Sequence, residues 1–271
     1  MSVMPSTDPR VDLEKLKRDL DIFGYVVVPN LIPREKAGRM SQRLMELMRR
    51  DPEHEQKPLQ NLHGVFNALE TPADFELFVP LLDNPVALAL AEYKLGMNFQ
   101  MSISGALWLK PHAGSAGFGW HADVPMGWFG ANKKPRVDLC FAINCLWMLT
   151  DFTQANGATR VLPFSHRSQS DPGQLGEADY ANAVSAEGSA GSCLIFDNAL
   201  WHAAGSNTSD QHRLGVSNPY FPIWLDGGNV GWTPVTRKTY AQLPPHVQKM
   251  HLHVLDDAAS GVSAGMTKRG Y

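Results

Sequence analysis

Cysteine is scarce in this chain. Its 271 residues include three, Cys140, Cys145 and Cys193, and no two of them have Cys-x-x-Cys spacing. An odd number without that spacing disfavours both a disulfide framework and a zinc–thiolate site. Each cysteine stands in an apolar, strand-like run, so we expect all three to be packed thiols in a reducing compartment.

Positive charge is not in excess either. The 24 Lys and Arg residues are outnumbered by 27 Asp and Glu, which gives a net charge of −3, and no basic run is interleaved with aromatic residues. This balance disfavours nucleic acid as a partner. Apolar runs stay far below the roughly 18 residues of a membrane span, and the N-terminal "MSVMPSTDPRVDLEKLKRDL" has charges where a signal peptide is apolar. We therefore expect a cytoplasmic protein with no membrane partner.

Helix signals are concentrated in the first third of the sequence. Apolar residues recur at helical spacing between a capping Asp12 and Gly24, and again over 33–50. Thr71-Pro72 and Asn84-Pro85 each place a side-chain acceptor before a proline, which has no N–H, and so predict two further helix starts. A short strand, "YVVVP", interrupts this helical region.

From about residue 99 the pattern changes to short β-type runs separated by Gly, Pro, Asn and Ser. Strands after a helical lead-in favour a β-sandwich or barrel supported by helices, and no Gly-rich strand-to-helix turn marks a doubly wound sheet. A chain of this length can form one enlarged domain. We expect residues 1–98 to be a mostly helical lead-in, 99–225 the β core and 226–271 a C-terminal cover.

Two histidines and an aspartate have the pattern of a metal site. In "GFGWHADVPMGWFG", His121 and Asp123 stand one residue apart, and on an extended backbone both side chains point to the same side. His-x-Asp is common by chance, so a third ligand is needed, and His202 follows another strand-like run. Two imidazoles and one carboxylate on one face of an ion leave positions open for a cosubstrate and dioxygen, which suits Fe(II).

Arg213 follows His202 by eleven residues, at the start of a further strand. A guanidinium forms two parallel charge-assisted hydrogen bonds with a carboxylate. Such a group near the metal would hold the far end of a dicarboxylate cosubstrate. The alternative for Arg213 is an ordinary ion pair with Asp197 or Asp210.

Five segments of the sequence are distinctive, and two of them contain the four residues named above. In order they are "FGYVVVPNLIP", "LLDNPVALALAEYKLG", "WHAD", "LTDFTQANGATRVLPFSHR" and "LWHAAGSNTSDQHRLGVSNPYF". Through these segments the sequence resembles the phytanoyl-CoA dioxygenase family of Fe(II)/2-oxoglutarate oxygenases, and the resemblance covers most of the chain. The Asn-Gly run before Leu-Pro-x-Ser-His is distinctive of the family.

The resemblance implies a mainly β fold with a helical N-terminal part: a double-stranded β-helix, or jelly-roll barrel, of about eight strands. His121, Asp123 and His202 would hold Fe(II), and Arg213 would bind the 5-carboxylate of 2-oxoglutarate. Dioxygen-dependent conversion of 2-oxoglutarate to succinate and carbon dioxide would drive oxidation of a small organic molecule, most simply hydroxylation of an unactivated carbon. Asp123 disfavours the halogenating relatives, which have a small residue there, whereas desaturation, epimerisation, ring formation and endoperoxidation stay open.

Further contacts are implied around the cosubstrate. Thr159 stands where some members place a hydroxyl against 2-oxoglutarate. The family also tends to use a polar side chain from the region matched by "QNLHGVFN", where Gln60, His63 and Asn67 are all candidates.

The tryptophans Trp120 and Trp201 each stand directly before a candidate ligand, and we expect them to pack against and orient the imidazoles. Loops 124–136 and 165–190 are expected to shape the substrate pocket, since long loops in compact domains are often lids or binding loops. Lys133, Lys134 and Arg136 in the first loop could meet an anionic group or form a solvated turn.

Two other classes of function stay open. A jelly-roll metalloenzyme with a non-redox ion such as Zn²⁺, acting as a hydrolase or isomerase, would need neither Arg213 nor a dicarboxylate. A non-catalytic ligand-binding barrel would be free to lose Asp123. Turnover of 2-oxoglutarate separates both from the oxygenase.

Overall fold

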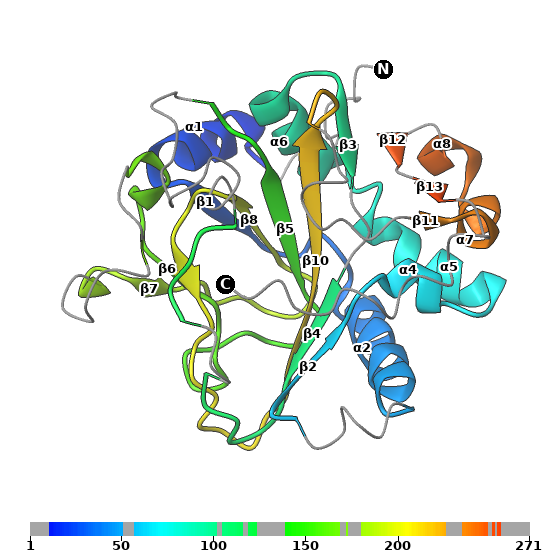
Figure 1. Ribbon diagram of the computed structural model, residues 1–271. Coiled ribbons are helices and arrows are strands. Elements are labelled where there is room, and N and C mark those ends of the chain that lie inside the picture. Colours follow the sequence, from blue (N-terminus) through cyan, green and yellow to red (C-terminus); the bar gives the residue numbers. More distant parts are fainter. Residues whose placement is uncertain are drawn as a thin grey trace.

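A computed structural model describes residues 11–50, 57–101, 105–115, 119–123, 139–168, 172, 180–225, 235–248, 251–252 and 254–255. Figure 1 shows their arrangement. The helices and 3-10 turns are α1 Leu13–Phe23, α2 Arg34–Met48, α4 Val65–Ala68, α5 Pro72–Phe78, η1 Val79–Leu81, α6 Pro85–Leu95, η2 Ser165–Arg167, α7 Arg237–Gln242 and α8 Pro245–Gln248. The strands are β1 Tyr25–Val28, β2 Leu59–Leu62, β3 Phe99–Met101, β4 Gly105–Leu109, β5 Ile143–Met148, β6 Arg160–Val161, β7 Val184–Ser185, β8 Cys193–Asp197, β9 His202–Ala203, β10 Arg213–Pro222, β11 Val235–Thr236, β12 His251–Leu252 and β13 Val254–Leu255.

The main sheet is built around the long strand β10. Its order is β1-β8-β5-β10-β3-β12, with β4 also paired to β10 and β2 paired to β4. Strands from residues 25–28 and 59–62 therefore join a sheet whose centre comes from 143–222, and β12 adds a strand from the C-terminal region. The β2 pairing was not expected from the sequence. Strands from all three expected segments of the chain belong to one sheet. The division of the chain at residues 98 and 225 stays a prediction.

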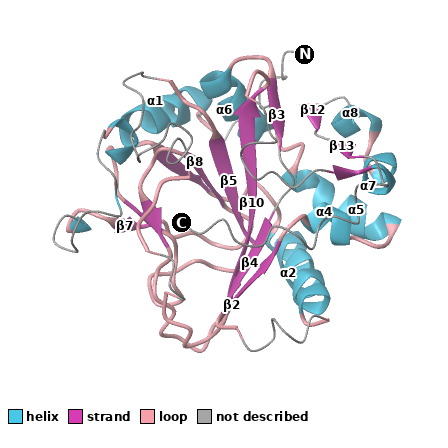
Figure 2. Ribbon diagram, viewed as in Figure 1, coloured by secondary structure: helices cyan, strands magenta, loops and turns pink. Residues whose placement is uncertain are grey.

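A smaller sheet, β7-β6-β9, lies beside the main one (Figure 2). An apolar cluster packs between the two sheets, and its buried members come from strands of both and from the loops that join them: Leu146, Met148, Phe152, Ala158, Val161, Ala186, Leu194, Phe196 and Leu200. Two sheets packed face to face with helices outside are the mainly β architecture that the sequence indicated.

The helices cover the opposite face of the main sheet, where a larger buried cluster joins them to the strands. Their ends follow the local signals in the sequence. Asp12 accepts a hydrogen bond from the backbone N–H of Lys15, and Gly24 ends α1 with φ of 84°. Thr71 and Asp74 form a capping box at α5. The predicted helix starts are confirmed.

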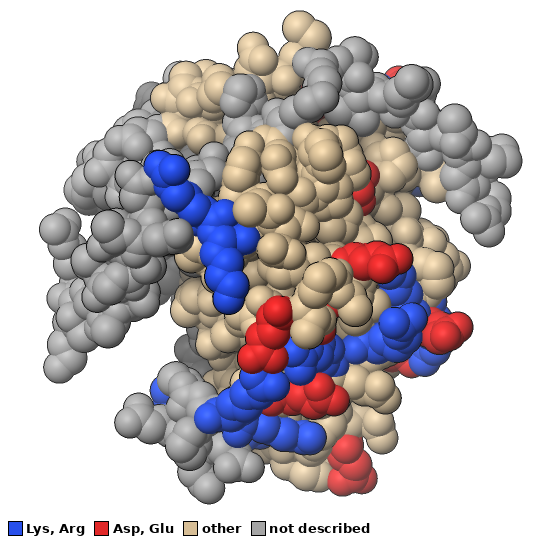
Figure 3. All heavy atoms as spheres, turned by 90° about the vertical axis from the view of Figure 1, so that its right-hand side faces the viewer, with Lys and Arg blue, Asp and Glu red and all other residues tan. Residues whose placement is uncertain are grey.

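Charges on the helical side are interleaved. On the face turned to the viewer in Figure 3, basic and acidic side chains alternate over much of the lower half and form no broad patch of one sign. Ion pairs join helices of the chain: Arg43 contacts Glu70 and Asp74, and Arg50 contacts Glu70. Of the helices that the structure describes, none has the length and apolar character needed to cross a bilayer.

The cysteines are unpaired: Cys145 and Cys193 are buried and Cys140 is half-buried. This agrees with their expected packing role. The loop expected over 124–136, with Lys133, Lys134 and Arg136, lies outside the described residues, and so do residues 169–171 and 173–179 of the loop expected over 165–190.

Candidate metal centre

The two candidate histidine ligands are held by one backbone pairing. His121 donates its N–H to the carbonyl of His202 at 3.0 Å, and His202 donates to the carbonyl of His121 at 2.9 Å. Residues that exchange both bonds in an antiparallel pair carry their side chains on the same face. The turn structure that follows His121 then brings Asp123 to that face.

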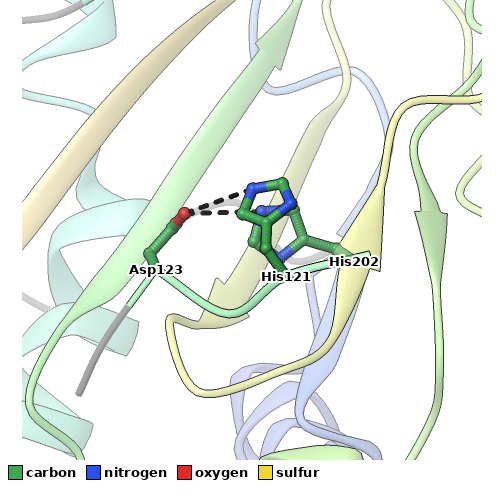
Figure 4. A group of neighbouring side chains, drawn as sticks. All are labelled: His121, Asp123 and His202. Atoms are coloured by element: carbon green, nitrogen blue, oxygen red, sulfur yellow. Dashed lines mark ion pairs between the residues drawn. The ribbon is translucent and has the colours of Figure 1, made fainter. Parts of the chain in front are cut away.

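The three side chains converge (Figure 4). One ligand atom from each of His121, Asp123 and His202 lies within 4.8 Å of the others. Asp123 Oδ1 is 3.7 Å from His121 Nε2 and 3.6 Å from His202 Nε2. These separations are longer than hydrogen bonds and match donors that share an ion, since metal–ligand distances of about 2.0–2.2 Å place neighbouring ligands roughly 3 Å apart.

Both imidazoles present Nε2 to this common point because Nδ1 is occupied. His121 Nδ1 lies 2.8 Å from the carbonyl of Gly119, and His202 Nδ1 lies 2.9 Å from the carbonyl of Leu200. A carbonyl can only accept, so each Nδ1 carries the proton and each neutral ring leaves the Nε2 lone pair for a metal.

The site is closed on one side and open on the other. The His202 side chain is 11% exposed, whereas those of His121 and Asp123 are 41% and 31% exposed. Burial lowers the pKa of His202, against the opposing effect of the Asp123 carboxylate. A neutral His202 is the form that ligates a metal, and the exposed side leaves room for further ligands.

Arg213 is a buried cation that no carboxylate in the described part of the chain neutralises. It is 3% exposed, and its Nε and Nη1 have no hydrogen-bond partner there. Asp210 instead pairs with His112, and Asp197 accepts from the N–H of Ala199. Burial lowers the pKa of Arg213 to about 10, which leaves it charged at neutral pH. A buried unpaired charge is costly, so the arrangement fits an anionic ligand.

The apolar cluster between the sheets links Arg213 to the histidines. The Arg213 guanidinium lies 5.0 Å from the centre of the Phe152 ring. At another part of the same cluster, the Phe196 ring centre lies 4.9 Å from that of His202. Arg213 and the metal triad therefore border one apolar interior, as an elongated cosubstrate held at both ends requires.

The other candidate contacts of 2-oxoglutarate lie in different surroundings. Thr159 is buried beside β6, and its carbonyl accepts from the N–H of Ala186, but its contact with 2-oxoglutarate stays a prediction. Asn67 binds the backbone of Thr236, and His63 is exposed next to Asn61. A contact of either residue with 2-oxoglutarate stays a prediction.

Gln60 is buried in β2 but points away from Arg213. Gln60 is in register with Trp108, whereas Leu59 and Arg213 are both in register with Leu109. Because side chains alternate along a strand, Leu59 shares the face of Arg213 and Gln60 takes the other.

Three polar residues on the inner face were missed. By the same register Asn61 lies on the Arg213 face, and on that face Ser217 Oγ lies 2.7 Å from Asn144 Oδ1. Asn144 is directly opposite Phe196. The two-residue period of "AINCLWM" and "RLGVSNPYF" could have placed Asn144 and Ser217 inside once the pairing of the strands was known.

A jelly-roll core with a facial His-Asp-His set and a buried arginine defines a class of non-haem metalloenzyme. The comparison with known families is more specific, since the model of the phytanoyl-CoA dioxygenase (PhyH) family matches residues 20–215. The chain belongs to this family, as the sequence segments indicated.

The curated relatives include a protein named as a dioxygenase and one without a described function. Dioxygenase af480 of Aspergillus fumigatus is 26% identical over 235 residues, which cover 81% of this chain and 72% of the relative. The uncharacterized protein Rv1501 of Mycobacterium tuberculosis is 39% identical over 79 residues, 29% of this chain and 28% of that protein. The match thus spans less than a third of the mycobacterial protein.

Solved structures share the fold at low sequence identity. The α-ketoglutarate-dependent epimerase SnoN from nogalamycin biosynthesis has a TM-score of 0.57 and 23% identity, over 79% of this chain and 82% of SnoN. HygX from Streptomyces hygroscopicus, solved with nickel, 2-oxoglutarate and hygromycin B, has a TM-score of 0.60 and 13% identity, over 88% of this chain and 95% of HygX. The carbocyclase SnoK has a TM-score of 0.60 and 18% identity, over 85% of this chain and 94% of SnoK. The expected double-stranded β-helix fold is confirmed.

The residues present fit the expected cofactors. The donor set is two neutral imidazoles and one carboxylate on one face, with an exposed side for further ligands. The buried, unpaired guanidinium fits the distal carboxylate of 2-oxoglutarate. Fe(II), 2-oxoglutarate and dioxygen are the set that family membership and this donor chemistry support.

Proposed function

We propose that this protein is an Fe(II)- and 2-oxoglutarate-dependent oxygenase that hydroxylates an unactivated carbon of a small organic molecule. The carrying observation is the combination of the His-Asp-His face with Arg213, a buried cation without a carboxylate partner among the described residues. A non-redox metalloenzyme would have no use for that cation, and its cost to folding would be unexplained.

Each residue has a definite task in this proposal. His121, Asp123 and His202 hold the metal, and the Nδ1 hydrogen bonds fix both rings for it. Arg213 binds the 5-carboxylate of 2-oxoglutarate, with Thr159 close to the same end. Bound iron supplies the capacity to activate dioxygen for oxidative decarboxylation of the cosubstrate. The apolar wall around Phe152 and Phe196 excludes water from the region between the two groups.

The proposed substrate is a small molecule. HygX and SnoN are solved with hygromycin B and nogalamycin RO, which supports a small-molecule substrate for this fold. Epimerase and carbocyclase neighbours show that the fold serves other outcomes, so hydroxylation rests on its being the simplest reaction of the class. The unpaired cysteines support a reducing, cytoplasmic setting.

The test follows succinate and product together. Purified protein with Fe(II), 2-oxoglutarate, dioxygen and a panel of small molecules should form succinate, and a true substrate should raise the rate and gain one oxygen atom from ¹⁸O₂. Zn²⁺ in place of Fe(II) should give no succinate. Succinate with a product of unchanged oxygen content would replace hydroxylation by epimerisation, desaturation or ring closure, and catalysis with Zn²⁺ alone would replace the oxygenase.

A further inference from the structure

Tyr180 touches both tryptophans that precede the histidine ligands. It is 3% exposed although it belongs to the polar loop before β7. Its ring stacks on Trp120 with centres 4.2 Å apart and planes 5° apart. The same ring meets Trp201 edge to face, with centres 6.3 Å apart. The Tyr180 hydroxyl donates to the carbonyl of Pro172, which fixes the ring from its other end.

Trp120 is oriented by stacking. Its indole N–H is buried and has no hydrogen-bond partner among the residues described. The guanidinium of Arg160 in β6 lies 5.0 Å from the indole centre. Both kinds of contact hold a ring in place beyond the effect of the area that they bury. Removing the parallel stack therefore removes one of the two restraints on this ring.

The backbone converts ring position into ligand position. Trp120 is bonded to His121 and Trp201 to His202, and consecutive side chains of an extended chain point to opposite sides. The tryptophans thus lie behind the pair of histidines, and one tyrosine holds both. The histidine backbones bond to each other, and each Nδ1 bonds to a carbonyl of its own segment, that of Gly119 or Leu200. The placement of these two segments therefore depends on what packs behind them.

We propose that Tyr180 is a positioning residue for the metal centre: its ring spans Trp120 and Trp201 and so sets the relative placement of His121 and His202. This inference rests on the proposed function, since it concerns the same metal. The two tryptophans are bonded to His121 and His202 and not to Asp123, so Tyr180 acts on the histidine side of the site. Tyr180 thereby becomes part of the support of the metal site.

The test is the affinity of the full chain for Co²⁺, titrated anaerobically through its visible d–d absorption. Tyr180→Leu keeps an apolar side chain but has no ring, and it should raise the Co²⁺ Kd about 10- to 100-fold, the usual effect of losing support behind a ligand, and change the shape of the band. Tyr180→Phe keeps the ring and should bind Co²⁺ like the wild type, because only the bond to Pro172 is lost.

A matched control separates positioning from general destabilisation. Phe66 is 1% exposed and packs against Phe78 in the cluster on the helical face, so Phe66→Leu should lower the melting temperature and leave the Co²⁺ Kd and spectrum unchanged. If Tyr180→Leu does not fold, Trp120→Leu removes the other half of the stack and should give the same loss of affinity.

Wild-type affinity and spectrum in Tyr180→Leu, or in Trp120→Leu where the first variant is unfolded, would overturn the positioning role. Failure of the wild-type protein itself to bind Co²⁺ would instead overturn the proposed function.

Discussion

The imidazole rings of His121 and His202 lie with their centres 4.2 Å apart and their planes inclined by 51°. Two rings at this inclination direct their Nε2 atoms toward one point, and Asp123 Oδ1 lies within 3.7 Å of both atoms. The fold itself therefore assembles a set of donors on one face, and such preorganisation keeps the cost of ordering the ligands low.

Removal of Asp123 should abolish metal-dependent turnover. Asp123→Ala deletes the only carboxylate in the triad, and the loss in Fe(II) affinity should exceed the roughly 10- to 100-fold typical of second-sphere changes. Fe(II) titration and succinate formation measure it. Asp210→Ala is the matched control, since Asp210 is an exposed carboxylate paired with His112; equal losses in the two variants would contradict the assignment.

Arg213→Met should weaken 2-oxoglutarate and leave a shorter 2-oxo acid unaffected. Charge-assisted hydrogen bonds are worth about 1.5–3 kcal/mol, or roughly 10- to 100-fold in Kd. Pyruvate lacks the distal carboxylate, so its Kd should be the same in wild type and variant. Calorimetric titration of both acids measures the two Kd values. An equal increase in the Kd of both acids would show that Arg213 does not bind the distal carboxylate.

The same substitution should stabilise the ligand-free protein. Arg213 is buried, its pKa is lowered to about 10 by burial, and two of its nitrogens are unpaired in the described structure. Replacement by an apolar side chain should raise the free energy of unfolding by roughly 1–3 kcal/mol. Thermal unfolding with and without 2-oxoglutarate checks this, because the cosubstrate should raise the melting temperature of the wild type more than that of Arg213→Met. A less stable ligand-free variant would show that Arg213 has an internal partner.

The convergence of His121, Asp123 and His202 could be predicted from the sequence because its information is local. A two-residue step puts His121 and Asp123 on one side, and His202 and Arg213 occur in recognisable segments. The choice among Gln60, His63 and Asn67 could not be made, because it depends on which face of β2 points inward, and that is fixed by pairing with β4. Tyr180 gave no signal, since its loop has no periodic pattern and its partners are distant in sequence.

Stability should fall at low pH through Asp74. Burial raises the pKa of this carboxyl, but hydrogen bonds from Arg43 and from the N–H groups of Glu70 and Thr71 outweigh it and hold the pKa below the usual 3.8. A lowered folded pKa means that the stabilisation is complete above the unfolded pKa and is lost as the pH falls through the folded value. Asp74→Asn should therefore cost about 1–3 kcal/mol at pH 7 and progressively less below pH 4. A cost independent of pH would contradict this, and urea unfolding across pH measures it.

Two glycines should respond oppositely to alanine. Gly157 has φ of 84°, and a Cβ there would lie 2.8 Å from the carbonyl oxygen of Gly205 and 2.7 Å from Leu109. Gly157→Ala should cost about 1–3 kcal/mol and weaken 2-oxoglutarate, because Leu109 is in register with Arg213. Gly38 lies in α2 with open space around its Cα, so Gly38→Ala should stabilise by up to about 1 kcal/mol. Unfolding of both variants in urea tests the pair, and equal effects would contradict the backbone argument.

The central claim is that the triad and Arg213 together bind iron and 2-oxoglutarate. The direct measurement is anaerobic visible spectroscopy of metal-stripped protein to which Fe(II) and then 2-oxoglutarate are added. We predict the weak charge-transfer band of an iron-chelated 2-oxo acid, absent in Asp123→Ala and shifted to higher 2-oxoglutarate concentration in Arg213→Met. No band in the wild-type protein, with tight binding of Zn²⁺ at the same residues, would contradict the account and leave a hydrolytic or binding barrel in its place.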